Sequence, residues 1–354
     1  MRSVLVAAWI GSTNLGDELV FASLVHKLRA RSVDVTAVSL EPSATERDHA
    51  VHAIGHLDAF TLMRRVSSAD AVIFGGGGLL QNRTSAFNLP YHLARPVVAR
   101  VRQRRLAAIG VGVGPLEGAI AERLVRVALS RATPITVRDE ASAQRLQRLG
   151  LAARTTADLA FGLNPPSRVE ADRIVVCLRP WSAERRLLPV GARPPSTDEW
   201  FVPTAAEALD ETAARTGLPV HFVALQQDRD HALHEEVAGR MRASVSFATP
   251  TVHDVLDEIA RGAIVISARY HGLVGAALAG RPCVAVAYDP KVGALARDLG
   301  DATELLPWSR PGIAALPEAA SSVATRVDDA VESRERMRTR EHGNDDAIDE
   351  LLSH

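Results

Sequence analysis

Two side chains that could bind an anion and move a proton, Arg269 and His271, directly follow an apolar run at residues 264–267. A helix-compatible run, residues 273–279, comes next. The sequence therefore predicts a strand-to-helix turn at the carboxyl end of a parallel strand, where open α/β sheets bind ligands. A guanidinium can grip a phosphate or carboxylate, and an imidazole can transfer a proton near neutral pH. A solvated arginine and a histidine that caps a core helix would also explain the pattern.

Three more basic side chains stand where predicted strands end. Arg138 follows residues 134–137, Arg179 follows an apolar strand that begins at Ile174, and Lys291 follows residues 282–287. Parallel strands bring their carboxyl ends to one edge of a sheet, so these cations can gather around a small, densely charged anion. A surface ion pair between Arg138 and Asp139 is the alternative for the first of them.

Two glycine-rich stretches lie at the ends of other predicted strands. The turn at residues 11–18 contains Asn14, Gly16 and Asp17, and its acidic residues suit the positive end of a helix. Residues 75–78 are four successive glycines, which favours close approach of the backbone to a ligand and amides arranged as an anion nest. The dinucleotide fingerprint Gly-x-Gly-x-x-Gly is absent, and an ordinary capped turn also fits residues 11–18.

No metal centre or cysteine chemistry is expected. His49, His52 and His56 could share one helix face within residues 44–56, but no cysteine or acidic motif accompanies them, so we expect a solvated helix. The cysteines, Cys177 and Cys283, lie in apolar runs and read as buried hydrophobic residues. No serine or cysteine nucleophile motif is evident.

Composition excludes some partners. The 354 residues are 47% hydrophobic and 23% charged with a net charge of −1, typical of a globular protein with no overall attraction to nucleic acid. The apolar run at residues 4–9 is too short for a signal peptide, which leaves the cytoplasm as the expected location. The basic run at residues 100–105 fits a solvated helix end best, and a nucleic-acid or anionic-lipid patch is the alternative. Contact with the inner face of the membrane stays open.

Alternating apolar strands and helices place the chain in the α/β class, with two Rossmann-like domains facing a cleft. We expect an N-terminal domain at residues 1–165, a C-terminal domain at 166–310 and a helical tail at 311–354. Within the tail, residues 318–340 suggest a helix that docks on the first domain, and 344–354 a short terminal helix. Residues 185–196 read as a loop.

Seven segments along the chain form a recognisable set: GSTNLGDE at 11–18, FGGGGLLQN at 74–82, TVRD at 136–139, LRPW at 178–181, LQ at 225–226, SARYH at 267–271 and YDPKV at 288–292. Taken together, these segments resemble the polysaccharide pyruvyltransferase family, and within it the enzymes that pyruvylate cell-wall polymers. Each segment alone is weak, but they span nearly the whole chain in the family's order. Two residues depart from the pattern: Asn82 stands where Asp is common, and Leu159 where Pro is common.

The resemblance implies a GT-B-like fold and transfer of a pyruvyl group from phosphoenolpyruvate to two hydroxyls of one sugar, as a cyclic ketal. The family's donor positions would fall on Asn14, Arg138, Arg179, His271 and Lys291. No cofactor is expected beyond this donor. The acceptor sugar stays open between lipid-linked, polymeric and nucleotide-linked forms, as do peripheral membrane contact and oligomeric state.

We therefore expect His271 and Arg269 to be catalytic. Residues expected to bind substrate are Asn14, Gly16, Asp17, Gly75, Gly76, Gly77, Gly78, Gln81, Arg138, Arg179, Gln226, Ser267, Tyr288 and Lys291. Two other functions remain open at this point: a GT-B glycosyltransferase that uses a nucleotide sugar, and a non-catalytic protein that binds a sugar or phosphate.

Overall fold

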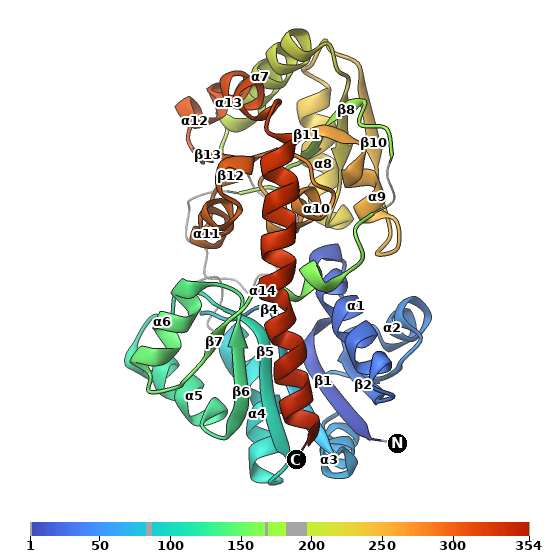
Figure 1. Ribbon diagram of the computed structural model, residues 1–354, viewed down its shortest axis with the longest axis vertical. Helices are drawn as coiled ribbons and strands as arrows, with labels where there is room; N and C mark the ends of the chain where they lie inside the picture. The colour runs from blue at the N-terminus through green and yellow to red at the C-terminus, as the bar shows by residue number, and fades with distance from the viewer. Residues whose placement is uncertain (1, 83–86, 167–168, 182–196, 354) are drawn as a thin grey trace.

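The computed structural model describes residues 2–82, 87–166, 169–181 and 197–353, which form two α/β domains, each on one sheet (Figure 1). The predicted loop at 185–196 lies outside these residues. All strand pairs in both sheets are parallel. Their strands are nearly continuous apolar runs, as expected for parallel strands covered on both faces.

The first sheet has the order β3-β2-β1-β4-β5-β6-β7. Its strands are β1 (Ser3–Ile10), β2 (Asp34–Ser39), β3 (His52–Gly55), β4 (Ala71–Leu80), β5 (Arg105–Val113), β6 (Ala132–Val137) and β7 (Arg154–Thr155). The connecting helices are α1 (Leu15–Ala30), α2 (Pro42–His49), α3 (Ala59–Ser68), α4 (Asn88–Val101), α5 (Ala119–Leu129), α6 (Glu140–Arg148) and the 3₁₀ helix η1 (Leu159–Gly162).

The second sheet has the order β10-β9-β8-β11-β12-β13. Its strands are β8 (Arg173–Cys177), β9 (Val220–Val223), β10 (Val245–Ala248), β11 (Gly262–Ser267), β12 (Cys283–Ala287) and β13 (Thr303–Pro307). Its helices are α7 (Phe201–Thr216), α8 (Gln227–Ala238), α9 (Val255–Ala260), α10 (Tyr270–Leu278), α11 (Pro290–Leu299), the 3₁₀ helix η3 (Gly300–Ala302), α12 (Arg310–Ala314) and α13 (Leu316–Val323).

One long helix, α14 (Val327–Ser353), runs along both domains (Figure 1). Its apolar residues join a core cluster that also contains residues of α1 and α10, so the two domains share one buried interface. Asn344 accepts hydrogen bonds from Thr136 and Thr156, and Lys27 forms a buried ion pair with Glu341 at 2.9 Å. The helix predicted at 318–340 is divided between α13 and α14, and only its α14 part docks on the first domain. The separate terminal helix predicted at 344–354 is wrong, because these residues continue α14.

The helices of the first domain form two layers. Helices α3, α4 and α5 pack on one face of the sheet, in a core separate from the one that α1, η1 and α14 build on the other face. In the second domain, α13 packs against α7 and the strands β12 and β13, so residues 316–323 of the predicted tail cover the second sheet. Both cysteines are buried, as expected.

The four glycines at 75–78 differ from their prediction. They lie within β4, which continues to Leu80 beside β5, so they do not form an anion-binding turn. Gly75 and Gly76 have φ values of 154° and 78°. A Cβ on Gly75 would lie 2.2 Å from the Ile109 carbonyl oxygen, and one on Gly76 would lie 2.2 Å from Val20. Gly75 and Gly76 thus allow close packing against protein rather than ligand.

The histidine-rich stretch at 44–56 is also not one solvated helix. Helix α2 ends at His49, whose buried Nε2 lies 2.9 Å from Glu18 Oε2, and the chain then enters β3 with His52. A short strand with one polar face gives a weak sequence signal, so β3 was not expected. None of the described helices is both long enough and apolar enough to span a membrane.

Candidate active site

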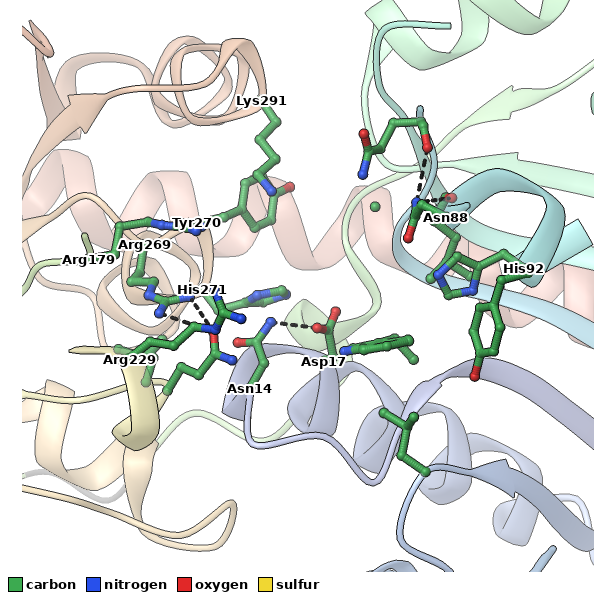
Figure 2. Close-up of a pocket in the computed structure, with 18 of the residues that line it drawn as sticks. Asn14, Asp17, Asn88, His92, Arg179, Arg229, Arg269, Tyr270, His271 and Lys291 are labelled. Carbon is green, nitrogen blue, oxygen red and sulfur yellow. Dashed lines mark hydrogen bonds between the residues drawn. The ribbon is translucent and has the colours of Figure 1, made fainter. Parts of the chain in front are cut away.

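A cavity of about 490 Å³ lies between the two domains, where strands of both sheets end. Figure 2 shows basic side chains of the second domain on one side, Asn88 and His92 of the first domain on the other, and Asp17 between them. The residues that line it are Trp9, Asn14, Asp17, Leu40, His56, Gly78, Leu79, Gln81, Phe87, Asn88, Tyr91, His92, Arg138, Arg179, Leu225, Gln226, Arg229, Arg269, Tyr270, His271, Tyr288 and Lys291.

The cavity brings together most of the residues that the sequence singled out. These are Asn14, Asp17, Gly78, Gln81, Arg138, Arg179, Gln226, Arg269, His271, Tyr288 and Lys291. The other five expected residues do not line it: Gly16, Gly75, Gly76, Gly77 and Ser267.

Arg179 and Lys291 form the cationic part of the second-domain wall, at the ends of β8 and β12. Arg179 Nη1 donates a hydrogen bond to the Tyr288 hydroxyl at 2.7 Å and lies over that ring. Lys291 extends into the cavity, and its ammonium group has no hydrogen-bond or ion-pair partner among the described residues (Figure 2). Burial alone would raise the pKa of Tyr288, but Arg179 and Lys291 lower it below its ordinary value. The wall is therefore strongly electropositive.

Arg269 is already paired inside the protein. Its Nε donates to Asp230 Oδ2 at 3.0 Å, its Nη2 contacts the other oxygen of that buried carboxylate, and both terminal nitrogens reach Gln226 Oε1. Ser267 lies beneath this turn, where its hydroxyl accepts from the Arg269 amide and donates to the Arg269 carbonyl. The geometry suits Arg269 to holding Gln226 in place, because Asp230 balances its charge.

Arg138 and His271 meet at one buried carboxylate, Asp158. Arg138 Nη1 lies 3.1 Å from Asp158 Oδ2, and His271 Nε2 lies 3.6 Å from Asp158 Oδ1. Burial alone would raise the pKa of Asp158, but His271 and Arg138 hold it below its ordinary range, so it stays ionised. Arg138 also lies over the ring of Tyr270, 4.2 Å from its centroid. The sequence reading did not assign Asp158 to the site.

Gly16 has a part in placing His271. Helix α1 of the first domain passes so close to α10 of the second that a Cβ on Gly16 would lie 2.0 Å from His271 Nδ1. Gly16 thus makes room for the imidazole, although the sequence had assigned it to substrate. Only 7% of His271 is exposed, so helix α1 and Asp158 hold the ring at the wall of the cavity.

Asp17 is the only carboxylate among the described residues that line the cavity. Asn14, which caps α1 by accepting from the Gly16 amide, donates from its side-chain nitrogen to Asp17 Oδ2. Burial raises the pKa of Asp17 above its ordinary value, against the opposing effect of His271 and Lys291. A carboxyl group that keeps its proton to higher pH can act as a general acid.

Aromatic side chains form the first-domain wall, which sequence reasoning missed. Trp9 at the end of β1 makes edge-to-face contacts with Tyr91 and His92 of α4, and the Tyr91 hydroxyl lies 2.8 Å from His56 Nδ1. Arg95 lies over the Tyr91 ring, 3.9 Å from its centroid. The position of Trp9 after an apolar strand could have pointed to it, but the α4 residues look like ordinary core positions in the sequence.

His92 should make the protein sensitive to acid. Burial and the nearby Arg95 lower its pKa to about 3, whereas an unfolded chain protonates histidine near 6.5. The unfolded state therefore binds more protons between these values, and stability is lost as pH falls below about 6.5. Each pH unit costs up to about 1.4 kcal/mol.

We therefore expect His92→Gln to lose less stability than the parent protein between pH 7.5 and pH 5, by up to about 2 kcal/mol. Urea denaturation midpoints at the two pH values measure this difference. The buried His234 is present in both proteins, so its effect cancels. Equal acid-induced losses in the two proteins would contradict the assignment.

Comparison with known proteins identifies a family. The model of the polysaccharide pyruvyl transferase family matches residues 14–290, which is most of the chain and runs from the capping Asn14 to the start of α11. No match was found among curated proteins.

Solved structures show the same fold. Staphylococcus aureus MnaA, solved with UDP, has 12% identity and a TM-score of 0.65, with 100% of this chain and 98% of that chain covered. The Neisseria meningitidis UDP-GlcNAc 2-epimerase, solved with UDP-GlcNAc, has 11% identity and a TM-score of 0.61, with 100% of each chain covered. The Methanocaldococcus jannaschii UDP-GlcNAc 2-epimerase has 10% identity and a TM-score of 0.60, with 96% of this chain and 98% of that chain covered.

At these identities the structures support the fold alone, and they confirm the expected GT-B-like arrangement of two Rossmann-like domains. The match over residues 14–290 supports the resemblance seen in the sequence motifs. The chain belongs to the polysaccharide pyruvyl transferase family.

Proposed function

We propose that this protein transfers a pyruvyl group from phosphoenolpyruvate to two hydroxyls of a sugar in a cell-surface glycan or its precursor, with release of phosphate. The observation that carries the proposal is the grouping of Lys291, Arg179 and Arg138 around Asp17 and His271 in one cavity. Phosphoenolpyruvate carries a phosphate and a carboxylate, and this wall offers several cations for them.

The donor would lie against the second-domain wall. Lys291, which lacks an internal partner among the described residues, and Arg179 are suited to hold the phosphate and carboxylate. Arg138 is suited to the same task from the first domain, although Asp158 balances part of its charge. Arg269 would act through Gln226, which it holds at the edge of the cavity. The proposed phosphoenolpyruvate site thus combines Lys291, which has no ion-pair partner among the described residues, with Arg138, which is paired with Asp158.

The methylene carbon of phosphoenolpyruvate must gain a proton before a sugar hydroxyl can add to C2. Asp17 or His271 would protonate the methylene carbon, which leaves an oxocarbenium-like centre at C2. The first sugar hydroxyl would add there and lose its proton to the group that had given one. Phosphate would then leave with the C–O bonding electrons, and the second hydroxyl would close the ketal. The proton of the first hydroxyl restores the acid that protonated the carbon. The proton of the second hydroxyl leaves with phosphate, so atoms and charges balance.

The acceptor would lie against the aromatic wall of the first domain. Trp9 and Tyr91 present apolar ring surfaces, and His92, whose lowered pKa keeps it neutral, can exchange hydrogen bonds with hydroxyl groups. Pockets that combine aromatic surface with a few polar groups are common small-molecule sites. This wall therefore fits a sugar better than it fits a second anion.

The test is acceptor-dependent release of phosphate from phosphoenolpyruvate across a panel of mannosaminyl and galactosyl acceptors. Release with one sugar class supports the proposal and names the acceptor. Stabilisation by a nucleotide sugar without phosphate release would instead support the glycosyltransferase alternative. Binding of phosphoenolpyruvate without turnover on any acceptor would support a non-catalytic binding protein.

Lys291 provides a sharper test of the donor site. We expect Lys291→Met to raise the KM for phosphoenolpyruvate roughly 10- to 100-fold, because it removes a charge-assisted hydrogen bond. Lys291→Arg should restore much of the affinity, since it keeps the positive charge. Steady-state phosphate release at varied donor concentration measures both. An unchanged KM in the methionine variant would remove Lys291 from the donor site.

A further inference from the structure

Helix α4 is apolar on its outer face as well as its inner one. Its core side contributes Leu89 and Leu93. On the opposite side, Pro90, Ala94, Val97 and Val101 are all exposed, at spacings of three and four residues. Val101 is 71% exposed. A surface helix of a globular protein normally carries polar residues there.

The neighbouring helices extend this surface. Helices α3 and α5 pack beside α4 and cover the same face of the first sheet. Phe60 and Met63 of α3 are 78% and 43% exposed, and Ile120 of α5 is 79% exposed. We call the exposed side chains of these three helices the α3–α5 face: Phe60, Met63, Val97, Val101, Ile120, Leu124 and Val127.

Arginines lie on the same three helices and on the turn after α4. They are Arg64, Arg100, Arg102, Arg104, Arg123 and Arg126, and none of them pairs with a described carboxylate. The carboxylates on the same helices or the turns before them are Asp58, Glu117 and Glu122. The face is thus locally basic, although the whole chain has a net charge of −1.

We propose that the α3–α5 face docks on an anionic phospholipid bilayer. Exposed apolar side chains flanked by arginines match the interfacial mode of membrane binding, in which apolar groups enter the headgroup region and basic groups meet anionic lipids. Self-association through this face is disfavoured, because it would bring two sets of unpaired arginines together. Charge complementarity therefore selects the bilayer as the partner.

Docking through the α3–α5 face would bring the opening of the cavity close to the bilayer. Phe87, just before α4, lines the cavity and is also 74% exposed, so the cavity opens close to the start of the apolar stripe on α4. A sugar carried on a membrane lipid could then enter while its lipid stays in the bilayer. This step rests on the proposed function, whereas the docking does not.

Vesicle sedimentation tests the docking with the full chain. We expect it to bind vesicles of phosphatidylcholine with phosphatidylglycerol, and to bind pure phosphatidylcholine vesicles at least about tenfold more weakly. The triple variant Phe60→Ser, Val101→Ser, Ile120→Ser should lose at least about tenfold in binding to the anionic vesicles. The control is Leu305→Ser, Val327→Ser, Val331→Ser, which removes exposed apolar side chains elsewhere and should bind as the parent does.

Both triple variants should keep the parent melting temperature, because the changed side chains are exposed. Phosphate release with a water-soluble acceptor should also be unchanged, so a failure of docking is distinguishable from a failure of the proposed function. Absent binding to anionic vesicles, or equal binding by the two triple variants, would overturn the proposal. So would a parent dimer that the first triple variant converts to a monomer without any change in vesicle binding.

Discussion

Replacing His271 with alanine is expected to lower kcat for acceptor-dependent phosphate release by roughly 10²–10⁴-fold, the usual contribution of a positioned acid or base. The imidazole lies at the cavity wall, where Asp158 and the close approach of helix α1 fix its position. The variant removes the ring, while the ion pair between Arg138 and Asp158 can persist and hold the local fold.

The measurement is steady-state phosphate release at saturating donor and acceptor, with the melting temperature as a check on folding. His271→Gln keeps a polar side chain of similar length and should stay almost as inactive, because an amide cannot transfer a proton near neutral pH. His231→Ala, which changes a histidine outside the cavity, should keep parent activity. A fully active His271→Ala variant would remove the residue from the mechanism.

The second large effect is expected at Asp17. Asp17→Asn keeps the size of the side chain but removes the carboxyl proton, and we expect kcat to fall by roughly 10²–10⁴-fold. The KM for phosphoenolpyruvate should not rise, because the amide, like the protonated carboxyl, places no negative charge in an anion site. This separation of kcat from KM distinguishes an acid from a residue that merely binds the donor.

The pH dependence gives an independent test of Asp17. Burial raises its pKa, so the active protonated form should be lost as pH rises through that raised value. Parent kcat should therefore fall on the alkaline side of its profile, and this limb should be missing from the residual activity of Asp17→Asn. Asp228→Asn, at a carboxylate that does not line the cavity, is the control and should keep the parent profile. If kcat of Asp17→Asn still falls on the alkaline side, another group causes that fall and the assignment of Asp17 as the acid is contradicted.

Much of the second-domain wall could be predicted from the sequence because its residues stand next to clear strand signals. Arg179, Arg269, His271 and Lys291 each follow an apolar run, and parallel topology then brings them to one edge. The sequence could not show which of these cations are paired with a carboxylate in the folded protein. Asp230 lies on α8, far from Arg269 in the chain, and only the fold shows that it balances that charge.

The first-domain wall was harder to predict for a different reason. Tyr91 and His92 lie on a helix whose apolar periodicity indicates only burial, so their place at a cavity depends on how the second domain covers them. Gly75 and Gly76 misled in the opposite direction. Their conformational freedom is used for contacts with Ile109 and Val20, and a sequence does not distinguish a close protein neighbour from a close ligand.

The proposed pyruvyl transfer is tested most directly by following the carbon of the donor. Phosphoenolpyruvate labelled with ¹³C at C2 is incubated with the protein and the acceptor that supports phosphate release, and the products are examined by NMR. We predict that the label appears in a quaternary ketal carbon bonded to two oxygens of one sugar, in an amount equal to the phosphate released. Label that remains in phosphoenolpyruvate, or appears only in free pyruvate, would contradict pyruvyl transfer.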